Sequence, residues 1–137
     1  MSEENVEIVR RILAASRSGP PEETRNVALS LVAPAVEFRS RVMEVEGGEY
    51  FGHDGVRRYF DDIADAFRSW RNEAEGIAEV SPDGVLVDNV FHGVGKESGM
   101  AVELRSAILF IVRGGRVARC LSFSAREEAL EAAGLSE

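Results

Sequence analysis

The sequence has 137 residues, of which 45% are hydrophobic, which is enough for one domain with its own core over residues 1–137. The formal net charge of -8 argues against a nucleic-acid partner, which needs clustered Lys and Arg, and the single cysteine, Cys120, excludes an internal disulfide. No apolar run is long enough to cross a bilayer and the acidic start is unlike a secretory signal, so we expect a cytoplasmic protein with no membrane partner.

Two amphipathic helices are predicted first. Ser2, followed by two glutamates, suits a helix N-terminus, and apolar residues then recur on one helical stripe at Val6, Val9, Ile12 and Leu13. Gly19 and Pro20 end this helix. Pro21 can open a second helix, because proline is tolerated in a first turn, and Pro34 stops it.

A strand, an irregular segment and a third helix are predicted next. Residues 35–40 read as a strand, and residues 41–52 mix apolar and acidic residues around two glycines, which indicates a loop or an irregular edge. Asp54 is an acceptable N-cap for a helix that ends near Trp70, with an apolar face made by Val56, Tyr59, Phe60, Ile63 and Phe67.

The following segment is predicted to be part of an antiparallel meander. Residues 72–80 form a polar edge strand and residues 85–92 the next strand. A Ser-Pro-Asp-Gly turn over residues 81–84 joins them, because proline presets φ and glycine takes the left-handed position. Residues 93–99 are rich in glycine and form a flexible hairpin loop.

Two long strands over residues 100–123 form the centre of the predicted sheet. Gly114 and Gly115 join them, since both can adopt the positive φ of a tight hairpin turn. Residues 107–112 are apolar at both parities, which indicates burial on both faces of the strand.

A short helix is predicted to close the chain. Ser124 and Glu127 fit a capping box, the helix runs through Leu130, and Gly134 is its C-terminal stop. The order of elements predicts an α+β domain in which a curved sheet wraps helices.

Several segments carry a family resemblance: SEENVEIVRRILAA, ALSLVAPAVEF, YFGHDGVRRYF, the hairpin around RGGRV, and REEALEAAGL. In this order and spacing, the chain resembles the SnoaL-like (polyketide cyclase-like) branch of the nuclear transport factor 2-like superfamily. The resemblance implies a cone-shaped roll, with three to four helices on a strongly curved, mostly antiparallel sheet that encloses a pocket. It also implies homodimers that pack sheet against sheet. Relatives include polyketide cyclases, ketosteroid isomerases, epoxide hydrolases, dehydratases and proteins that only bind.

The register implied by this resemblance divides the strand residues between two faces. The pocket side receives Ile12, Phe38, Asn89, Phe91, Ser106, Ile108, Phe110, Cys120 and Ser122. The outer side receives Leu86, Val90, Leu109, Ile111, Leu121 and Phe123. The outer set is mostly large and apolar and needs a cover, and a second copy of the chain is the simplest one.

The resemblance places apolar residues where ketosteroid isomerases carry their catalytic groups. Ile12 aligns with the oxyanion-binding tyrosine, Phe38 with the base aspartate, and Ile108 with the second oxyanion-hole acid. Isomerase chemistry of that kind is therefore not expected. Ser124 and Ala125 stand where many SnoaL-like relatives carry an aspartate, which weakens a cyclase interpretation as well.

The remaining acid-base candidates are His53 and Tyr50. His53 could act at the pocket mouth with Tyr50 nearby, or it could be a polar residue at a helix cap. His92 and Asp88 are no dyad, because residues four apart on a strand lie roughly 13 Å from each other. Both fall on the outer face.

Three further pocket residues have two interpretations each. Asn89 could orient a ligand carbonyl or satisfy a neighbouring backbone group. Cys120 could be a nucleophile, but no inward histidine would activate it, which favours a buried core residue. Trp70, like the other aromatic residues, could form the pocket wall or fill the core.

These observations predict a SnoaL-like protein that binds a small hydrophobic or weakly polar molecule in a mostly apolar pocket. Phe38, Asn89, Phe91, Ser106, Ile108, Phe110, Cys120, Ser122 and Trp70 are the predicted ligand contacts, without a cofactor or metal. One alternative is a lyase, cyclase or isomerase that uses His53, Tyr50 and Asn89. Another is a non-catalytic module that associates through the outer face of its sheet.

Overall fold

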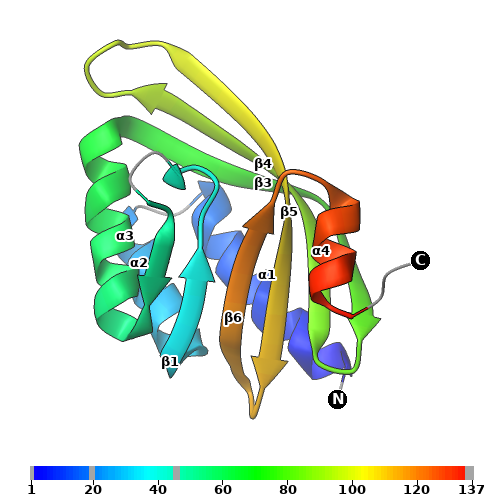
Figure 1. Cartoon of the computed structure of the whole chain (residues 1–137). Coiled ribbons are helices and arrows are strands. Elements are labelled where there is room, and N and C mark those ends of the chain that lie inside the picture. The colour runs from blue at the N-terminus through cyan, green and yellow to red at the C-terminus, as the bar shows by residue number, and fades with distance from the viewer. Residues whose placement is uncertain (1, 19–20, 45–46, 135–137) are drawn as a thin grey trace.

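The computed structural model describes residues 2–18, 21–44 and 47–134 (Figure 1). It contains four helices, α1 (Ser2–Ser18), α2 (Pro21–Leu31), α3 (Gly52–Ala66) and α4 (Arg126–Ala132). The sheet strands are β1 (Val32–Arg39), β2 (Glu49–Phe51), β3 (Phe67–Ser81), β4 (Gly84–Gly95), β5 (Ala101–Arg113) and β6 (Arg116–Phe123). The predicted stop of the first helix at Gly19 and Pro20 lies outside the described residues. None of the described helices is long and apolar enough to span a membrane.

The sheet is mostly antiparallel and strongly curved. Its strand order is β2-β1-β6-β5-β4-β3, and β1 against β6 is a parallel pair among otherwise antiparallel neighbours. Figure 1 shows α1, α2 and α3 on the concave side of the sheet and α4 on the opposite side. This arrangement confirms the predicted α+β cone.

The central hairpin forms as the sequence predicts. Gly114 and Gly115 both have positive φ, 60° and 79°, between β5 and β6. The buried part of β5 is apolar on both sides: Phe110 belongs to the core beneath the helices, whereas Leu109 and Ile111 belong to a core on the outer side. Burial of both faces explains why the polar alternation of the strand stops at Ala107.

The outer core has a cover within the same chain. Leu86, Leu109 and Ile111 pack with Ala129 of α4, and Phe123 and Leu130 lie against this cluster. A second copy is therefore not needed to bury these side chains. The prediction that the outer apolar residues need a cover was right. The helix α4 covers the cluster around Leu109.

The boundary between the third helix and the next strand differs from the prediction. The helix ends at Ala66, not near Trp70, and β3 begins at Phe67. The physical reason lies in the sheet, where the rings of Phe67 and Trp70 pack against Phe91 with centroid distances of 5.0 and 6.4 Å. These tertiary contacts outweigh the helical spacing of the apolar residues. The helix also starts earlier than Asp54, with Phe51 as its N-cap residue.

Two other predictions need correction. Pro34 lies inside β1, at a place where the pairing with β6 is irregular and a missing N–H costs no ladder hydrogen bond. In the final helix Glu128, not Glu127, is the capping partner. Its Oε1 accepts hydrogen bonds from Ser124 Oγ at 2.8 Å and from the Ala125 backbone N–H at 3.3 Å.

Candidate functional site: a neutral cavity inside the cone

A cavity of about 130 Å³ lies between the three concave-side helices and the inner face of the sheet. Eight of the nine predicted ligand contacts line it: Phe38, Trp70, Asn89, Ser106, Ile108, Phe110, Cys120 and Ser122. A cavity of about 150 Å³ in another protein holds benzene, so this space suits a compact molecule. Whether these residues contact a ligand stays a prediction, but the register that the resemblance implied placed all of them except Trp70 on the inner side.

Phe91 is the exception among the predicted contacts. It is 1% exposed and does not belong to the cavity wall. Trp70 lies between Phe91 and the cavity: its ring stacks on Phe91, and it is itself part of the wall. The prediction that Phe91 points to the inner side was correct. Strand parity gives the direction of a side chain, but it does not show whether that side chain reaches the cavity or is buried behind the wall.

Several wall residues were not predicted as contacts. Tyr59 and Phe60 come from α3, Ser40 and Val42 follow β1, and Asn72 comes from β3. Tyr59 and Phe60 were recognised only as part of the apolar face of a helix. Asn72 was assigned to a polar edge, and only the register of β3 on β4 brings it to the inner face.

The three positions at which the resemblance implies the catalytic groups of ketosteroid isomerases are all in the wall. Ile12, Phe38 and Ile108 line the cavity, and each presents an apolar side chain. Arg39 is the one charged residue among the described lining residues, and its guanidinium lies 4.8 Å from the ring centroid of Phe123 on the outer side. The described part of the lining contains neither a carboxylate nor a histidine. The interior is thus polar in places but carries no charge.

Two ionisable groups in the wall are held in their neutral forms. Burial raises the pKa of the Cys120 thiol to about 12. Burial also raises the pKa of Tyr59 well above its usual value, although a hydrogen bond with the Ser40 side chain partly opposes this. The thiolate is the nucleophilic form of cysteine, so Cys120 is inert at neutral pH. Both groups are therefore neutral parts of the wall.

An asparagine pair forms the most distinctive polar feature of the cavity. Asn89 is 4% exposed, and its Nδ2 donates a hydrogen bond to Oδ1 of Asn72 at 2.9 Å. The Oδ1 of Asn89 is buried and accepts no hydrogen bond from any described residue. A buried acceptor without a donor costs about 1–3 kcal/mol of stability. Such a cost in a cavity wall is typical of a functional position.

The predicted acid-base candidates lie outside this wall. The ring Nε2 of His53 is 3.1 Å from the Val32 carbonyl oxygen, to which it donates. Tyr50 is 2% exposed and its hydroxyl donates to Asp62 Oδ2 at 2.8 Å. Neither residue lines the cavity. Their role as an acid-base pair stays a prediction. In the structure each makes its own hydrogen bond, His53 with Val32 and Tyr50 with Asp62.

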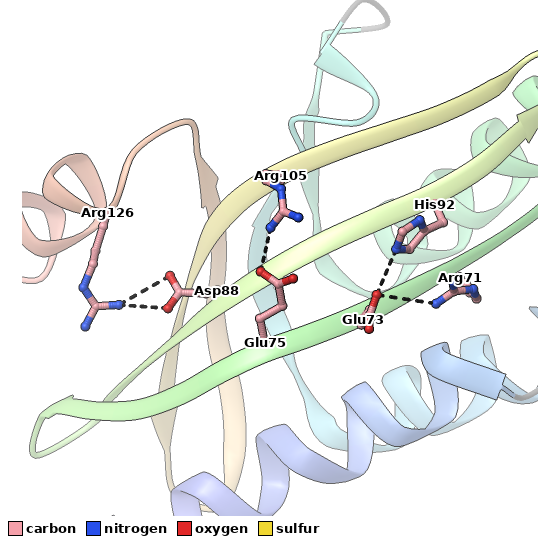
Figure 2. Close-up of polar contacts among 7 residues, drawn as sticks. All are labelled: Arg71, Glu73, Glu75, Asp88, His92, Arg105 and Arg126. Atoms are coloured by element: carbon pink, nitrogen blue, oxygen red, sulfur yellow. Dashed lines mark hydrogen bonds and ion pairs between the residues drawn. The ribbon is translucent and has the colours of Figure 1, made fainter.

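The outer face of the same sheet carries charged side chains beside the apolar core under α4. Figure 2 shows Glu73 between His92 and Arg71, with distances of 3.0 and 3.9 Å. Further along the sheet, Glu75 meets Arg105 at 2.6 Å.

At the end of this face, Asp88 meets Arg126 at 3.2 Å (Figure 2). The seven residues drawn in Figure 2 comprise three arginines, three carboxylates and His92, so each of these carboxylates has a basic neighbour. The predicted placement of His92 and Asp88 on the outer face, as separate residues and not as a dyad, is correct.

Comparisons with known proteins agree on the fold. A family model described as a SnoaL-like domain matches residues 9–120. No functionally curated protein matches the chain. Many solved structures are similar to it at low sequence identity, and three of them have TM-scores above 0.7 over most of both chains.

The first is TerC co-crystallised with polyporic acid, which is 21% identical with a TM-score of 0.71, over 88% of this chain and 90% of that one. The second is an NTF2-like protein of unknown function from Burkholderia pseudomallei, 18% identical with a TM-score of 0.74, over 93% and 95%. The third is a Mycobacterium tuberculosis protein in complex with estradiol-17beta-hemisuccinate, 19% identical with a TM-score of 0.71, over 90% and 95%.

Proposed function

Because the chain belongs to the SnoaL-like family, we propose that its cone binds a small hydrophobic or weakly polar molecule without performing acid-base chemistry on it. The observation that carries this proposal is the neutral lining of the cavity. General acid-base catalysis needs a positioned carboxylate, imidazole or similar group of suitable pKa. The described lining residues include no carboxylate or histidine, and the thiol and phenol there stay protonated.

Related structures support a binding role. TerC was crystallised with polyporic acid and the Mycobacterium tuberculosis protein with a steroid ester, and both share the fold of this chain. Both ligands are larger than the single ring that a cavity of about 130 Å³ suggests. We therefore propose a more compact ligand for this protein.

The binding proposal is tested by native mass spectrometry with a library of small aromatic and alicyclic compounds. We expect one-to-one adducts with the wild type that are lost in Ile108→Trp, which places a large ring in the cavity wall. Val102→Trp is the matched control, because Val102 is 41% exposed and lies outside the wall. Adducts that survive in Ile108→Trp, or a wild type that binds no compound, would contradict the proposal.

We also propose that two copies associate through the charged outer face. The protein carries a net charge of -8, which makes two copies repel each other at most approaches. On this face each carboxylate drawn in Figure 2 has a basic neighbour, which reduces this repulsion locally, and a twofold axis can set Arg105 of one copy against Glu75 of the other. Sedimentation analysis of the wild type and Arg105→Glu tests this. A monomeric wild type, or an unchanged dimer in the variant, would contradict it.

A further inference from the structure

One side chain in the cavity wall, Asn89, bears on the class of ligand that is bound. It is 4% exposed, and its Oδ1 accepts no hydrogen bond from any residue that the structure describes. Buried polar atoms in folded proteins nearly always have a partner. The acceptor is therefore a position that a bound molecule can complete.

The contact with Asn72 determines which end of the Asn89 amide is available. In the structure the Asn89 amide turns its Nδ2 toward Oδ1 of Asn72, at 2.9 Å. One of the two Nδ2 protons of Asn89 is thereby used, whereas its Oδ1 has no partner among the described residues. A ligand carbonyl, which is the partner that an asparagine in a pocket first suggests, has no proton to offer to that acceptor. A hydroxyl or a ring N–H has one.

The surroundings of this acceptor favour an aromatic body for the ligand. Ser106 is directly opposite Asn89 on the neighbouring strand and shares the cavity wall. Beyond these polar groups the wall is formed by large apolar side chains, among them Trp70, Ile108 and Phe110. The volume of about 130 Å³ limits the ligand to one ring or a compact fused pair, by comparison with a benzene-binding cavity of about 150 Å³.

The acceptor is shielded in the structure, so a small movement must present it. The Cβ–Cγ torsion of asparagine is soft, because it joins a tetrahedral to a planar carbon. Asn72 is half-buried and sits at the wall, so it can follow this rotation while keeping its hydrogen bond.

We propose that the cavity selects compact aromatic molecules with one hydrogen-bond donor, a phenolic hydroxyl or a ring N–H, which Asn89 Oδ1 accepts. This inference rests on the proposed binding function. Asn72 is a positioning residue, because it orients the Asn89 amide and leaves the acceptor for the ligand.

Three molecules of the same shape test the proposal: indole offers an N–H donor, benzofuran only an acceptor, and indene neither. Affinities are measured by titration calorimetry or by ligand-induced NMR shifts of the wild type. We expect indole to bind about tenfold more tightly than the other two, which corresponds to one hydrogen bond between neutral groups. The side-chain amide signals of Asn89 should move with indole and much less with indene.

Three variants test whether the preference for indole depends on the asparagine pair. Asn89→Leu should bind all three molecules with similar affinity, whereas Asn26→Leu, an exposed residue of α2, should keep the tenfold preference. Asn72→Ala frees the amide to present either end, so it should narrow the gap between indole and benzofuran while the affinity for indene stays the same. If Asn89→Leu does not fold, as judged by circular dichroism, the wild-type series and the Asn89 amide signals decide the matter.

The possible results separate the two proposals. Equal binding of all three molecules to the wild type, or tighter binding of benzofuran, overturns the donor selectivity and leaves the binding function standing. No binding by any of the three, together with no adduct from the wider library, overturns both.

Discussion

The inner and outer faces of the sheet differ in what covers them. The inner face, with Ile108 and Asn89, surrounds a neutral cavity. The outer face, with Leu109 and Asp88, is covered partly by α4 and partly by paired charges. Adjacent residues of one strand thus face an open space on one side and close packing on the other. The same substitution should therefore have different effects at neighbouring positions.

The largest expected effect comes from separating α4 from the outer face. Ala129 is 0% exposed and packs on Leu86 and Leu109, so Ala129→Asp places a carboxylate in an apolar cluster. We expect the free energy of unfolding to fall by about 3 kcal/mol, as for an unpaired buried charge. Urea unfolding measures this. Ala132→Asp is the matched control, since Ala132 lies exposed on the same helix. An equal loss in both variants would show that helix propensity, and not burial, is the cause.

Substitution of two neighbouring residues by phenylalanine compares the two faces directly. Leu109→Phe should lower the free energy of unfolding by about 1–3 kcal/mol, because Leu109 is 0% exposed within the outer core and a larger ring must displace its neighbours. Ile108→Phe should change it by less, because the added ring enters the cavity. Thermal unfolding of the two variants checks this. Equal destabilisation would mean that the cavity wall is as tightly packed as the outer core.

The raised pKa of Cys120 predicts a dependence of stability on pH. The unfolded thiol ionises near pH 9 and the folded thiol near pH 12, so the folded state holds the additional proton between these values. Stability from this group is therefore complete below pH 9 and is lost as pH rises toward 12, at up to about 1.4 kcal/mol per pH unit. The difference in unfolding free energy between the wild type and Cys120→Ala, measured from pH 8 to 10.5, isolates the thiol from Tyr59. A constant difference over this range would mean that the thiol is not buried as described.

The smallest expected effect concerns the charged pairs of the outer face. Arg105 and Glu75 lie at the surface, where an ion pair contributes about 0.2–1 kcal/mol. A double-mutant cycle with Arg105→Ala and Glu75→Ala, at low and at high salt, measures the coupling. We expect salt to weaken it. The value for a surface pair applies at protein concentrations low enough to keep the chain monomeric, and a coupling well above about 1 kcal/mol there would contradict a surface pair. A coupling that rises with protein concentration would support the proposed association of two copies through this face.

The sequence predicted the inner and outer faces well because both depend on strand parity. Gly114 and Gly115 define the hairpin, and the period of two separates Ile108 from Leu109, whereas the resemblance to SnoaL-like proteins implied which of the two faces the pocket. Parity also placed Asn89 correctly. The cover of the outer face was harder to predict, because Ala129 and Leu130 could equally belong to a short solvated helix, and nothing local indicates that they pack on Leu109.

The details that sequence could not supply depend on register over long distances. The contact between Asn72 and Asn89 needs the pairing of β3 with β4, which shifts between Ala74 and Gly76. The helical spacing of Phe67 likewise indicated helix, and only its contact with Phe91 explains why it begins a strand. The sequence analysis considered a ligand carbonyl or a backbone group as the partner of Asn89. In the structure its partner is the side chain of Asn72, which neither alternative included.

The parallel pairing of β1 with β6 has a consequence for folding. It joins segments far apart in the chain, as in the 3.0 Å contact between Arg119 and Glu37, which are 82 residues apart. The hairpins of β3 to β6 need only neighbouring residues and can form first, whereas β1 must wait until the last strand is in place. The cavity wall includes residues of both segments, so we expect it to close late in folding. We expect a ligand bound there to stabilise this pairing between the first and the last strand of the sequence.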